Sequence, residues 1–392
     1  MFPLEGITVI ALEQALAAPL ATRHLADLGA RIIKIERPAV GDFARDYDTT
    51  VRGMASHFVW ANRSKESLTL DLKHEQAKEI LNRLLAKADV FMQNLIPGAC
   101  ERLGLGTKDL QAKYPRLIIC NLSGYGNTGP YRDKKAYDLL IQSEAGLVSV
   151  TGTKETPSKV GVSIADTAAA MYAYSGILTA LLVRNRTGKG TAIEVSMLEA
   201  LGEWMGYAAY YTSYGGSQPP RTGAKHAAIA PYGPFVASDG ENVYLAIQNE
   251  REWSRFCEQV LECRDMISDV RFQNNSKRVQ NRDALEEIIN GIFKRLTRAV
   301  IIERLENAQI AYARLNSVQE FVDHPQLAAR NRWREIDSPA GPLRALVPPI
   351  TMDGVEPVMG AVPALGQHTQ AILEELGFDA ATIASWKKTG VI

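Results

Sequence analysis

A single carboxylate stands in a long apolar segment of this chain. The segment from Val160 to Val183 reads VGVSIADTAAAMYAYSGILTALLV, and Asp166 is its only formally charged side chain. Burying an unpaired carboxylate is costly, so Asp166 needs either a local partner or a chemical role. Ser163 lies three residues earlier, and this spacing fits a capping box at a helix N-terminus. The other interpretation is carboxylate chemistry, for which Asp138 and Asp166 are the two acids in apolar surroundings.

Other catalytic motifs receive little support. The stretch Gly124–Gly129, GYGNTG, matches G-x-G-x-x-G after an expected strand, but a proline and the charged run YRDKK follow where a dinucleotide-binding fold needs a helix. We therefore interpret it as a glycine turn that shapes a cleft. The six histidines show no H-x-x-x-H pair, and no Walker or G-x-S-x-G pattern occurs. The sequence thus predicts no metal site.

The four cysteines have no pairing pattern. Cys100, Cys120, Cys257 and Cys263 form no C-x-x-C motif and have no histidine at metal-ligand spacing. We expect free thiols.

Several cations follow expected strands. Arg37 follows RIIKIE and Lys73 follows SLTLDL, while Arg102 and Lys135 come after the next strand and the glycine turn. The carboxyl ends of parallel strands face the ligand crevice, so these side chains are placed to meet an anionic ligand.

Short β-branched runs alternate with helical patterns through the first half of the chain. The expected strands are 7–12, 31–36, 67–72, 89–95 and 116–123, and 187–197 reads as a turn followed by another strand. Such alternation predicts an α/β fold with a parallel sheet and right-handed crossovers. Residues 231–247 read as a hairpin turning at Asp239-Gly240, with helices and no further sheet up to 330. We predict a large domain from 1–224 and 331–392 and a small α+β domain from 225–330.

Composition narrows the class of partner. The 392 residues carry 44 Lys plus Arg and 44 Asp plus Glu without a block of like charge, which argues against nucleic acid or a membrane surface as partner. Residues 160–183 are long enough to span a membrane, but their polar residues favour a buried helix. The N-terminus shows no targeting pattern, so we expect a cytoplasmic protein.

Seven motifs recur in the order found in a known family. They are GITVIALEQALAAPLATRHLADLGARIIKIERPAVGDFAR, NRSKESLTLDLK, VFMQNLIPGACERLGLG, LSGYGNTGPY, the Asp166 segment, RTGKGTAIEVSM and PALGQHTQAILEELG. Together they resemble the family III CoA-transferases, which include formyl-CoA transferase, carnitine CoA-transferase and α-methylacyl-CoA racemase.

The resemblance carries expectations for fold and site. It implies a Rossmann-like large domain built from both termini, a smaller domain and an interlocked homodimer. It implies that Asp166 is the catalytic residue and that coenzyme A acts as a substrate, with no tightly bound cofactor. The residues to which it assigns substrate or CoA contacts are Arg37, Leu70, Lys73, Asn94, Leu95, Arg102, Leu103, Lys135, Tyr137 and Asp138. It also implies a glycine loop over the site, of which Gly215-Gly216 is a short version.

The family's chemistry gives Asp166 a role. A carboxylate can attack an acyl-CoA thioester to give a mixed anhydride and free CoA thiolate. The thiolate then attacks the aspartyl carbonyl to give an enzyme thioester, and an acceptor acid reverses these steps. The thioester bond is exchanged and not hydrolysed, so no ATP is required. Such intermediates need a closed, largely apolar pocket, and we expect the helix N-terminus to keep Asp166 ionised.

Two further segments, RPAVGDFARDYD and RTGAKHAAIAPYGPF, look like those of members that handle itaconate, mesaconate or citramalate with succinyl-CoA as donor. A second substrate carboxylate would need a cation, and the candidates are Arg45, Arg52, Arg221 and His226. Intramolecular CoA transfer remains an alternative. Racemisation is less favoured, because Tyr137 replaces the racemases' histidine and a tyrosine is a poor proton carrier near neutrality.

Overall fold

A computed structural model describes residues 2–392, which group into two units by their internal contacts. The first unit holds 2–145, 161–205 and 326–392, and the second holds 146–160 and 206–325. This division differs from the sequence-based boundaries, because 146–160 and 206–224 group with the second unit and 326–330 group with the first. The reason is local: the Arg221 guanidinium donates to the carbonyls of Ser149, Thr153 and Lys154, and thereby ties the two segments together.

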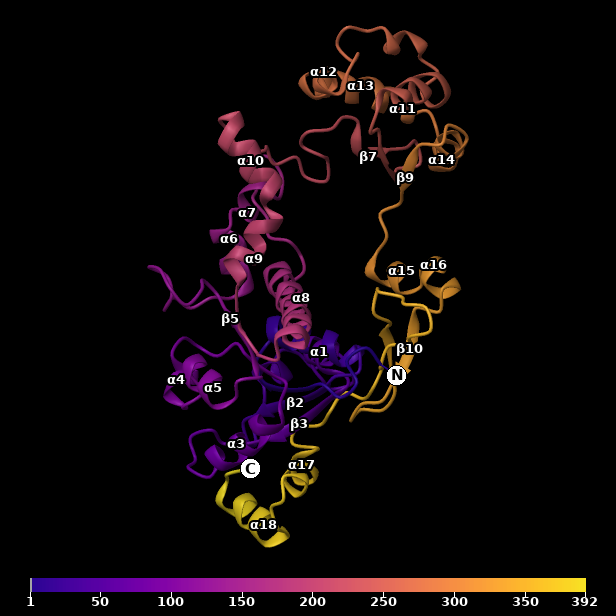
Figure 1. The fold of residues 1–392 in the computed structure, drawn as a ribbon. Coiled ribbons are helices and arrows are strands. Elements are labelled where there is room, and N and C mark those ends of the chain that lie inside the picture. The colour runs from indigo at the N-terminus through magenta and orange to yellow at the C-terminus, as the bar shows by residue number, and fades with distance from the viewer. Residues whose placement is uncertain (1) are drawn as a thin grey trace. The chain divides into compact units, whose positions relative to one another are not determined.

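A parallel sheet of six strands organises the first unit (Figure 1), and the predicted α/β fold is confirmed. The strands are β1 Thr8–Leu12, β2 Arg31–Glu36, β3 Lys65–Thr69, β4 Val90–Gln93, β5 Ile118–Ser123 and β6 Ala192–Ser196. Their order is β3-β2-β1-β4-β5-β6, with Ile10 paired to Ile33 on one side and to Phe91 on the other. The chain reverses its direction across the sheet between β1 and β4, and such a switch point opens a crevice at the carboxyl ends of the strands.

Helices connect and cover these strands. They are α1 Ala17–Asp27, the 3-10 turn η1 Phe43–Asp46, α2 Ser56–Asn62, α3 Ala77–Lys87, α4 Ala99–Arg102, α5 Thr107–Lys113, α6 Asp138–Glu144, α8 Ile164–Thr187, α9 Met197–Trp204, α17 Thr369–Glu375 and α18 Ala380–Thr389. A hairpin, β10 Trp333–Ile336 and β11 Leu343–Leu346, belongs to the same unit. Leu373 of α17 and Trp386 of α18 share one apolar core with Ile10, Ile33 and Leu84, so both ends of the chain build this unit.

The long apolar segment forms α8, the one helix of the described chain that is long and apolar enough to cross a membrane. One face of α8 packs along α1 and also contacts α9, β5 and β6 (Figure 1). That face consists largely of fully buried small residues, including Ala168, Ala169 and Ala173. Alanine lets the helix backbones approach closely. Leu182 and Val183, near its C-terminal end, are exposed.

The second unit contains a small antiparallel sheet and a cluster of helices. Its strands are β7 Tyr232–Val236, β8 Asn242–Ala246 and β9 Ala311–Ala313. Its helices are α7 Leu147–Val150, α10 Gly206–Gly215, α11 Glu250–Arg255, the π-helical turn η2 Phe256–Val260, the 3-10 turn η3 Arg264–Ile267, α12 Asn275–Gln280, α13 Arg282–Phe293, α14 Arg298–Asn307 and α15 Val318–Val322, with α16 Pro325–Ala329 at the boundary.

The hairpin at Asp239-Gly240 is confirmed, but the expectation of no further sheet was wrong. The three-residue β9 pairs with β8, with Tyr312 opposite Leu245. A strand of three residues is too short for an alternating pattern to reveal it.

A buried network of charges joins β1 and β2 to the loop that follows β2. Lys34 and Lys65 both contact Oε1 of Glu13, at 3.4 and 2.6 Å, and all three side chains are fully buried. Lys34 also donates to Asp42 at 2.8 Å, and Asp42 accepts a hydrogen bond from the backbone amide of Ala15. Ala15 has a φ of 63°, so the network stabilises a backbone turn that alanine seldom adopts.

Glu13→Gln tests how strongly this network supports the fold. Glutamine keeps an oxygen acceptor but removes the negative charge that the buried Lys34 and Lys65 share, and we expect a loss of about 3–5 kcal/mol in the free energy of unfolding. Urea unfolding measures the loss, with exposed Glu75→Gln as the control. Equal urea midpoints for both variants would contradict the expectation.

Candidate active site

Asp166 lies in the first turn of α8, but the expected capping box is absent. The Ser163 side chain makes no capping hydrogen bond. Instead, Oδ1 of Asp138 accepts hydrogen bonds from the backbone amides of Ala165 at 2.8 Å and of Asp166 at 3.3 Å. A carboxylate 28 residues earlier therefore supplies the cap, which the local spacing could not indicate.

The glycine turn fixes the position of Asp138. Residues 124–137 form no helix, and α6 begins only at Asp138, which confirms a turn and not a dinucleotide motif. A Cβ built on Gly124 would lie 2.2 Å from Cβ of Ala136, so only glycine allows this segment to fold back onto the end of β5. Nε2 of Gln142, one turn later on α6, donates to Oδ2 of Asp138 at 2.7 Å. Both oxygens of Asp138 thus accept hydrogen bonds.

The two carboxylates alter the chemistry of the nucleophile candidate. Burial, with a further contribution from the charge of Asp138, raises the pKa of Asp166 to about 7. This corrects the expectation that the helix N-terminus keeps Asp166 fully ionised, because desolvation and a neighbouring like charge outweigh the helix dipole. Near neutral pH, Asp166 exists as both acid and carboxylate.

Tyr47 and His57, which sequence patterns did not single out, form an aromatic pair, and Tyr47 lies within electrostatic reach of Asp166. Burial, followed by the charges of Asp42 and Asp166 and by Tyr137, raises the pKa of Tyr47 to about 12, so its phenol stays protonated. Its ring contacts His57 edge-on at a centroid distance of 5.8 Å. Tyr47 directly follows the 3-10 turn η1 and His57 lies on the short helix α2, where no periodic signal marks them. Tyr137, the predicted contact, is 63% exposed immediately before α6.

The predicted CoA contacts fall at the carboxyl side of the sheet. Arg37 and Lys73, which follow the adjacent strands β2 and β3, are exposed, as are Arg102 on α4 and Lys135 before α6. Leu70 is fully buried after β3, and Leu95 and Leu103 pack partly buried against the same core. Their role in binding CoA stays a prediction.

Asn94 has a structural role at the switch point. Its Oδ1 accepts from the amide of Gln14 and its Nδ2 donates to the carbonyl of the same residue, both at 2.9 Å. These bonds clamp the end of β4 to the end of β1.

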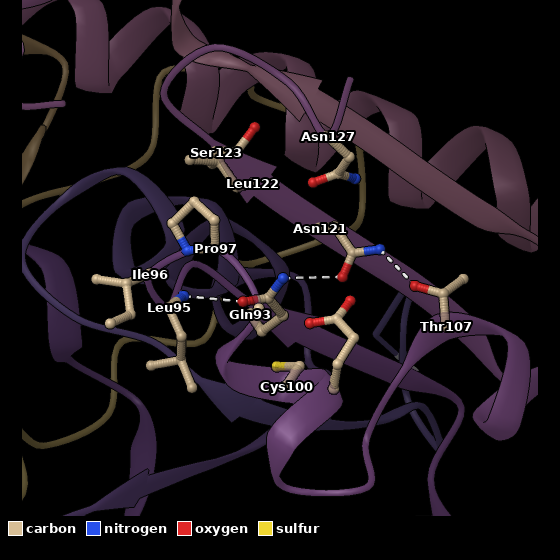
Figure 2. A pocket seen from close by; sticks show the side chains of 12 residues that line it. Gln93, Leu95, Ile96, Pro97, Cys100, Thr107, Asn121, Leu122, Ser123 and Asn127 are labelled. Atoms are coloured by element: carbon tan, nitrogen blue, oxygen red, sulfur yellow. Dashed lines mark hydrogen bonds between the residues drawn. The ribbon is translucent and has the colours of Figure 1, made fainter. Parts of the chain in front are cut away.

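A pocket opens beside this clamp, at the ends of β4 and β5 (Figure 2). Gln93 donates to Asn121 at 2.9 Å, and Asn121 donates to Oγ1 of Thr107 at 3.0 Å. Leu95 also lines the pocket, and its amide donates to Oε1 of Gln93 at 2.8 Å. Neither Asp138 nor Asp166 lines it. The pocket therefore includes one predicted CoA contact, Leu95, and is separate from the candidate nucleophile.

The four candidate contacts for a second carboxylate differ in their availability. Arg45 forms a two-pronged ion pair with Glu36 and stacks on Phe58. Arg52 is exposed and donates to the carbonyl of Pro342.

The other two candidates belong to the second unit. The Arg221 guanidinium is occupied by the three carbonyls already described. Nδ1 of His226 accepts from the amide of Ala228, and burial lowers the pKa of His226, so the ring is a poor cation at neutral pH.

The described residues contain no cluster of metal-ligating side chains. All four cysteines are free thiols, as expected. Burial raises the pKa of Cys100, Cys120 and Cys257 to about 12, which leaves these thiols unreactive.

Known proteins resemble this chain in sequence and in fold. A family model described as CoA-transferase family III matches residues 4–369. The chain belongs to this family and is a CoA-transferase. A mouse succinyl-CoA:glutarate CoA-transferase is 33% identical over 100% of the chain and 91% of its own length. A succinyl-CoA:mesaconate CoA-transferase from Haloarcula hispanica is 29% identical over 97% of the chain and 98% of its own. The crystal structure of a CaiB/BaiF family protein from Brucella suis matches with a TM-score of 0.83 and 33% identity, covering 96% of this chain and 99% of that one.

The raised pKa of Asp166 predicts that the free energy of unfolding depends on pH. The folded state holds a proton on Asp166 up to about pH 7, whereas the unfolded chain releases it near pH 4. The wild type therefore loses stability as pH rises from 4 through 7, and Asp166→Asn does not lose this contribution. Urea unfolding measures the free energy of unfolding of Asp166→Asn minus that of wild type. We expect this difference to be about 2 kcal/mol larger at pH 8 than at pH 5. A constant difference would show that Asp166 titrates normally.

Proposed function

We propose that this enzyme moves CoA from a dicarboxylyl-CoA donor such as succinyl-CoA to a short branched dicarboxylate such as itaconate or mesaconate, through an aspartyl-CoA thioester on Asp166. The supporting observation is the position of Asp166, partly buried in the first turn of α8 with a pKa near 7. Enough carboxylate exists at neutral pH for nucleophilic attack, and the side chain is poorly hydrated, which makes the carboxylate more reactive.

The chemistry proceeds by two exchanges. An oxygen of the Asp166 carboxylate attacks the thioester carbonyl, the C–S bond breaks, and CoA leaves as a thiolate with the electron pair. The thiolate then attacks the aspartyl carbonyl of the mixed anhydride, and the donor acid leaves as a carboxylate. The acceptor carboxylate reverses both steps, so the product is a new CoA thioester and Asp166 is regenerated.

The choice of dicarboxylates rests on the relatives and on local resemblance. Three relatives have names that pair succinyl-CoA with glutarate, mesaconate or L-malate. The segments around Arg45 and Arg221 resemble those of itaconate and mesaconate transferases. Since Arg45 and Arg221 already have partners, Arg52 is the candidate cation with the most exposed side chain for a second carboxylate.

Two alternatives use the same nucleophile or the same binding site. Intramolecular transfer between the C1 and C4 carboxyls of mesaconyl-CoA follows the same covalent steps. An α-methylacyl-CoA racemase needs acid and base groups on both faces of the α-carbon, and it would exchange the α-hydrogen with deuterated water.

Mass spectrometry of CoA thioesters tests the proposal directly. Purified enzyme is mixed with succinyl-CoA and itaconate, mesaconate or glutarate in turn, without ATP. We expect a branched-dicarboxylyl-CoA to form with wild type and to fall by roughly a thousandfold with Asp166→Ala, because the proposed anhydride and thioester both form on Asp166. Wild-type activity retained by Asp166→Ala would overturn the covalent route.

The acceptor trials separate the alternatives. If glutaryl-CoA is the only new thioester that forms, the acceptor is glutarate and the proposed type of reaction still holds. Conversion of mesaconyl-CoA without a second acid would favour intramolecular transfer, and deuterium incorporation into a 2-methylacyl-CoA would favour racemase activity.

We also propose that the enzyme is a homodimer. The resemblance implies one, and large exposed apolar side chains support it: Tyr210 and Tyr214 of α10 are 71% and 84% exposed, and Leu182 of α8 is 63% exposed. Isolated surface residues of this kind are ordinary, but a helix with exposed aromatic side chains indicates a partner surface. Sedimentation should give twice the chain mass of 43.0 kDa, whereas a monomer mass would contradict the proposal.

A further inference from the structure

We infer that Asp138 is a positioning residue whose charge favours the acylated forms of Asp166, while its hydrogen bonds hold the start of α8 in place. The inference rests on the covalent route proposed above. It assigns Asp138 a role different from the substrate or CoA contact expected from the sequence.

The geometry joins Asp138 to the backbone of the nucleophile. Oδ1 of Asp138 accepts from the amides of Ala165 and Asp166, and Oδ2 accepts from Nε2 of Gln142. Because Ser163 supplies no side-chain cap, these contacts are the side-chain cap of the first turn of α8. The bonds involve backbone amides, so they persist whether the Asp166 side chain is free or acylated.

The charge of Asp138 acts on the free carboxylate. Asp138 is the charged group that adds to burial in shifting the pKa of Asp166, and no lysine or arginine of residues 2–392 offsets it. Tyr47 is a further titratable group nearby, since its pKa responds to the charge of Asp166 and to Tyr137. The other elements that pack on α8 also carry titratable groups, which include Arg23 and His24 of α1, Glu194 of β6 and Glu199 of α9. None of these groups contributes comparably to the pKa shift of Asp166.

Acylation removes the repulsion between the two carboxylates. In the free enzyme, both carry negative charge once Asp166 is ionised. When Asp166 attacks the thioester, its formal charge is lost and the departing CoA thiolate carries it away. The anhydride and the aspartyl thioester are therefore neutral beside Asp138. Only the free carboxylate is destabilised, so the charge of Asp138 shifts the equilibrium toward the covalent intermediates.

Asp138→Asn separates the charge from the cap. An asparagine keeps the Oδ1 acceptor and is among the best capping residues, but it carries no charge. Asp138→Ala removes both. Exposed Asp133→Asn, five residues earlier, is the matched control, because it removes a carboxylate that caps nothing.

Two measurements follow on the full-length enzyme. The first is the pH profile of the transfer rate, in which we expect the acidic midpoint near pH 7 to fall by about 1 pH unit in Asp138→Asn and to stay unchanged in Asp133→Asn. The second is intact-protein mass spectrometry at pH 8 with succinyl-CoA, in which the fraction of aspartyl-CoA enzyme should fall by up to about tenfold in Asp138→Asn. A purely structural cap would move neither quantity in the asparagine variant.

The outcomes separate this inference from the proposed function. If wild type forms no adduct on Asp166, the covalent route fails and the inference fails with it. If wild type forms the adduct and Asp138→Asn keeps the wild-type midpoint and adduct fraction, only the inference is overturned. If Asp138→Asn turns over too slowly for a profile, its urea unfolding at pH 5 and pH 8 reports the pKa of Asp166: a smaller loss of stability than in wild type supports the inference, and an equal loss overturns it.

Discussion

Two carboxylates held at the start of one helix are the constraint on which the site depends. Asp138 caps α8 through the amides of Ala165 and Asp166, so it lies close to the side chain of Asp166. A cap normally stabilises a helix at little electrostatic cost. Here the cap also places a negative charge beside a partly buried acid, and together with burial this raises the pKa of Asp166 to about 7.

Several features of the first unit serve to hold this pair. The missing side chain at Gly124 lets Ala136 fold against the end of β5, and α6 begins two residues later at Asp138. The alanine-rich face of α8 packs along α1, which fixes the helix that carries Asp166. On the neighbouring strands, the buried pairs among Glu13, Lys34, Lys65 and Asp42 order the loop after β2. The same loop region contains Tyr47, and the charge of Asp166 contributes to the raised pKa of its phenol.

The sheet separates two tasks within one unit. Its switch point lies between β1 and β4, where Asn94 clamps Gln14, and the predicted CoA contacts lie after the strands on either side. A CoA thioester is long enough for its nucleotide end and its acyl carbonyl to be bound by different elements. The pocket at Gln93 and Asn121 is lined by neither Asp138 nor Asp166, so the proposed nucleophile and this pocket are separate places in the unit.

The sequence by itself determined the class of fold, the parallel strands and the identity of the candidate nucleophile. Strand alternation is a local pattern, and the family motifs extend over nearly the whole chain. It did not determine what caps α8, because a carboxylate 28 residues before Asp166 is indistinguishable from a surface acid until the fold brings it near. The sequence also did not indicate that Arg221 is hydrogen-bonded to carbonyls and Arg45 to Glu36. Nor did it indicate that the charge of Asp166 raises the pKa of Tyr47. Contacts between distant segments and the desolvation of a charge depend on packing in three dimensions, so only the tertiary structure decided them.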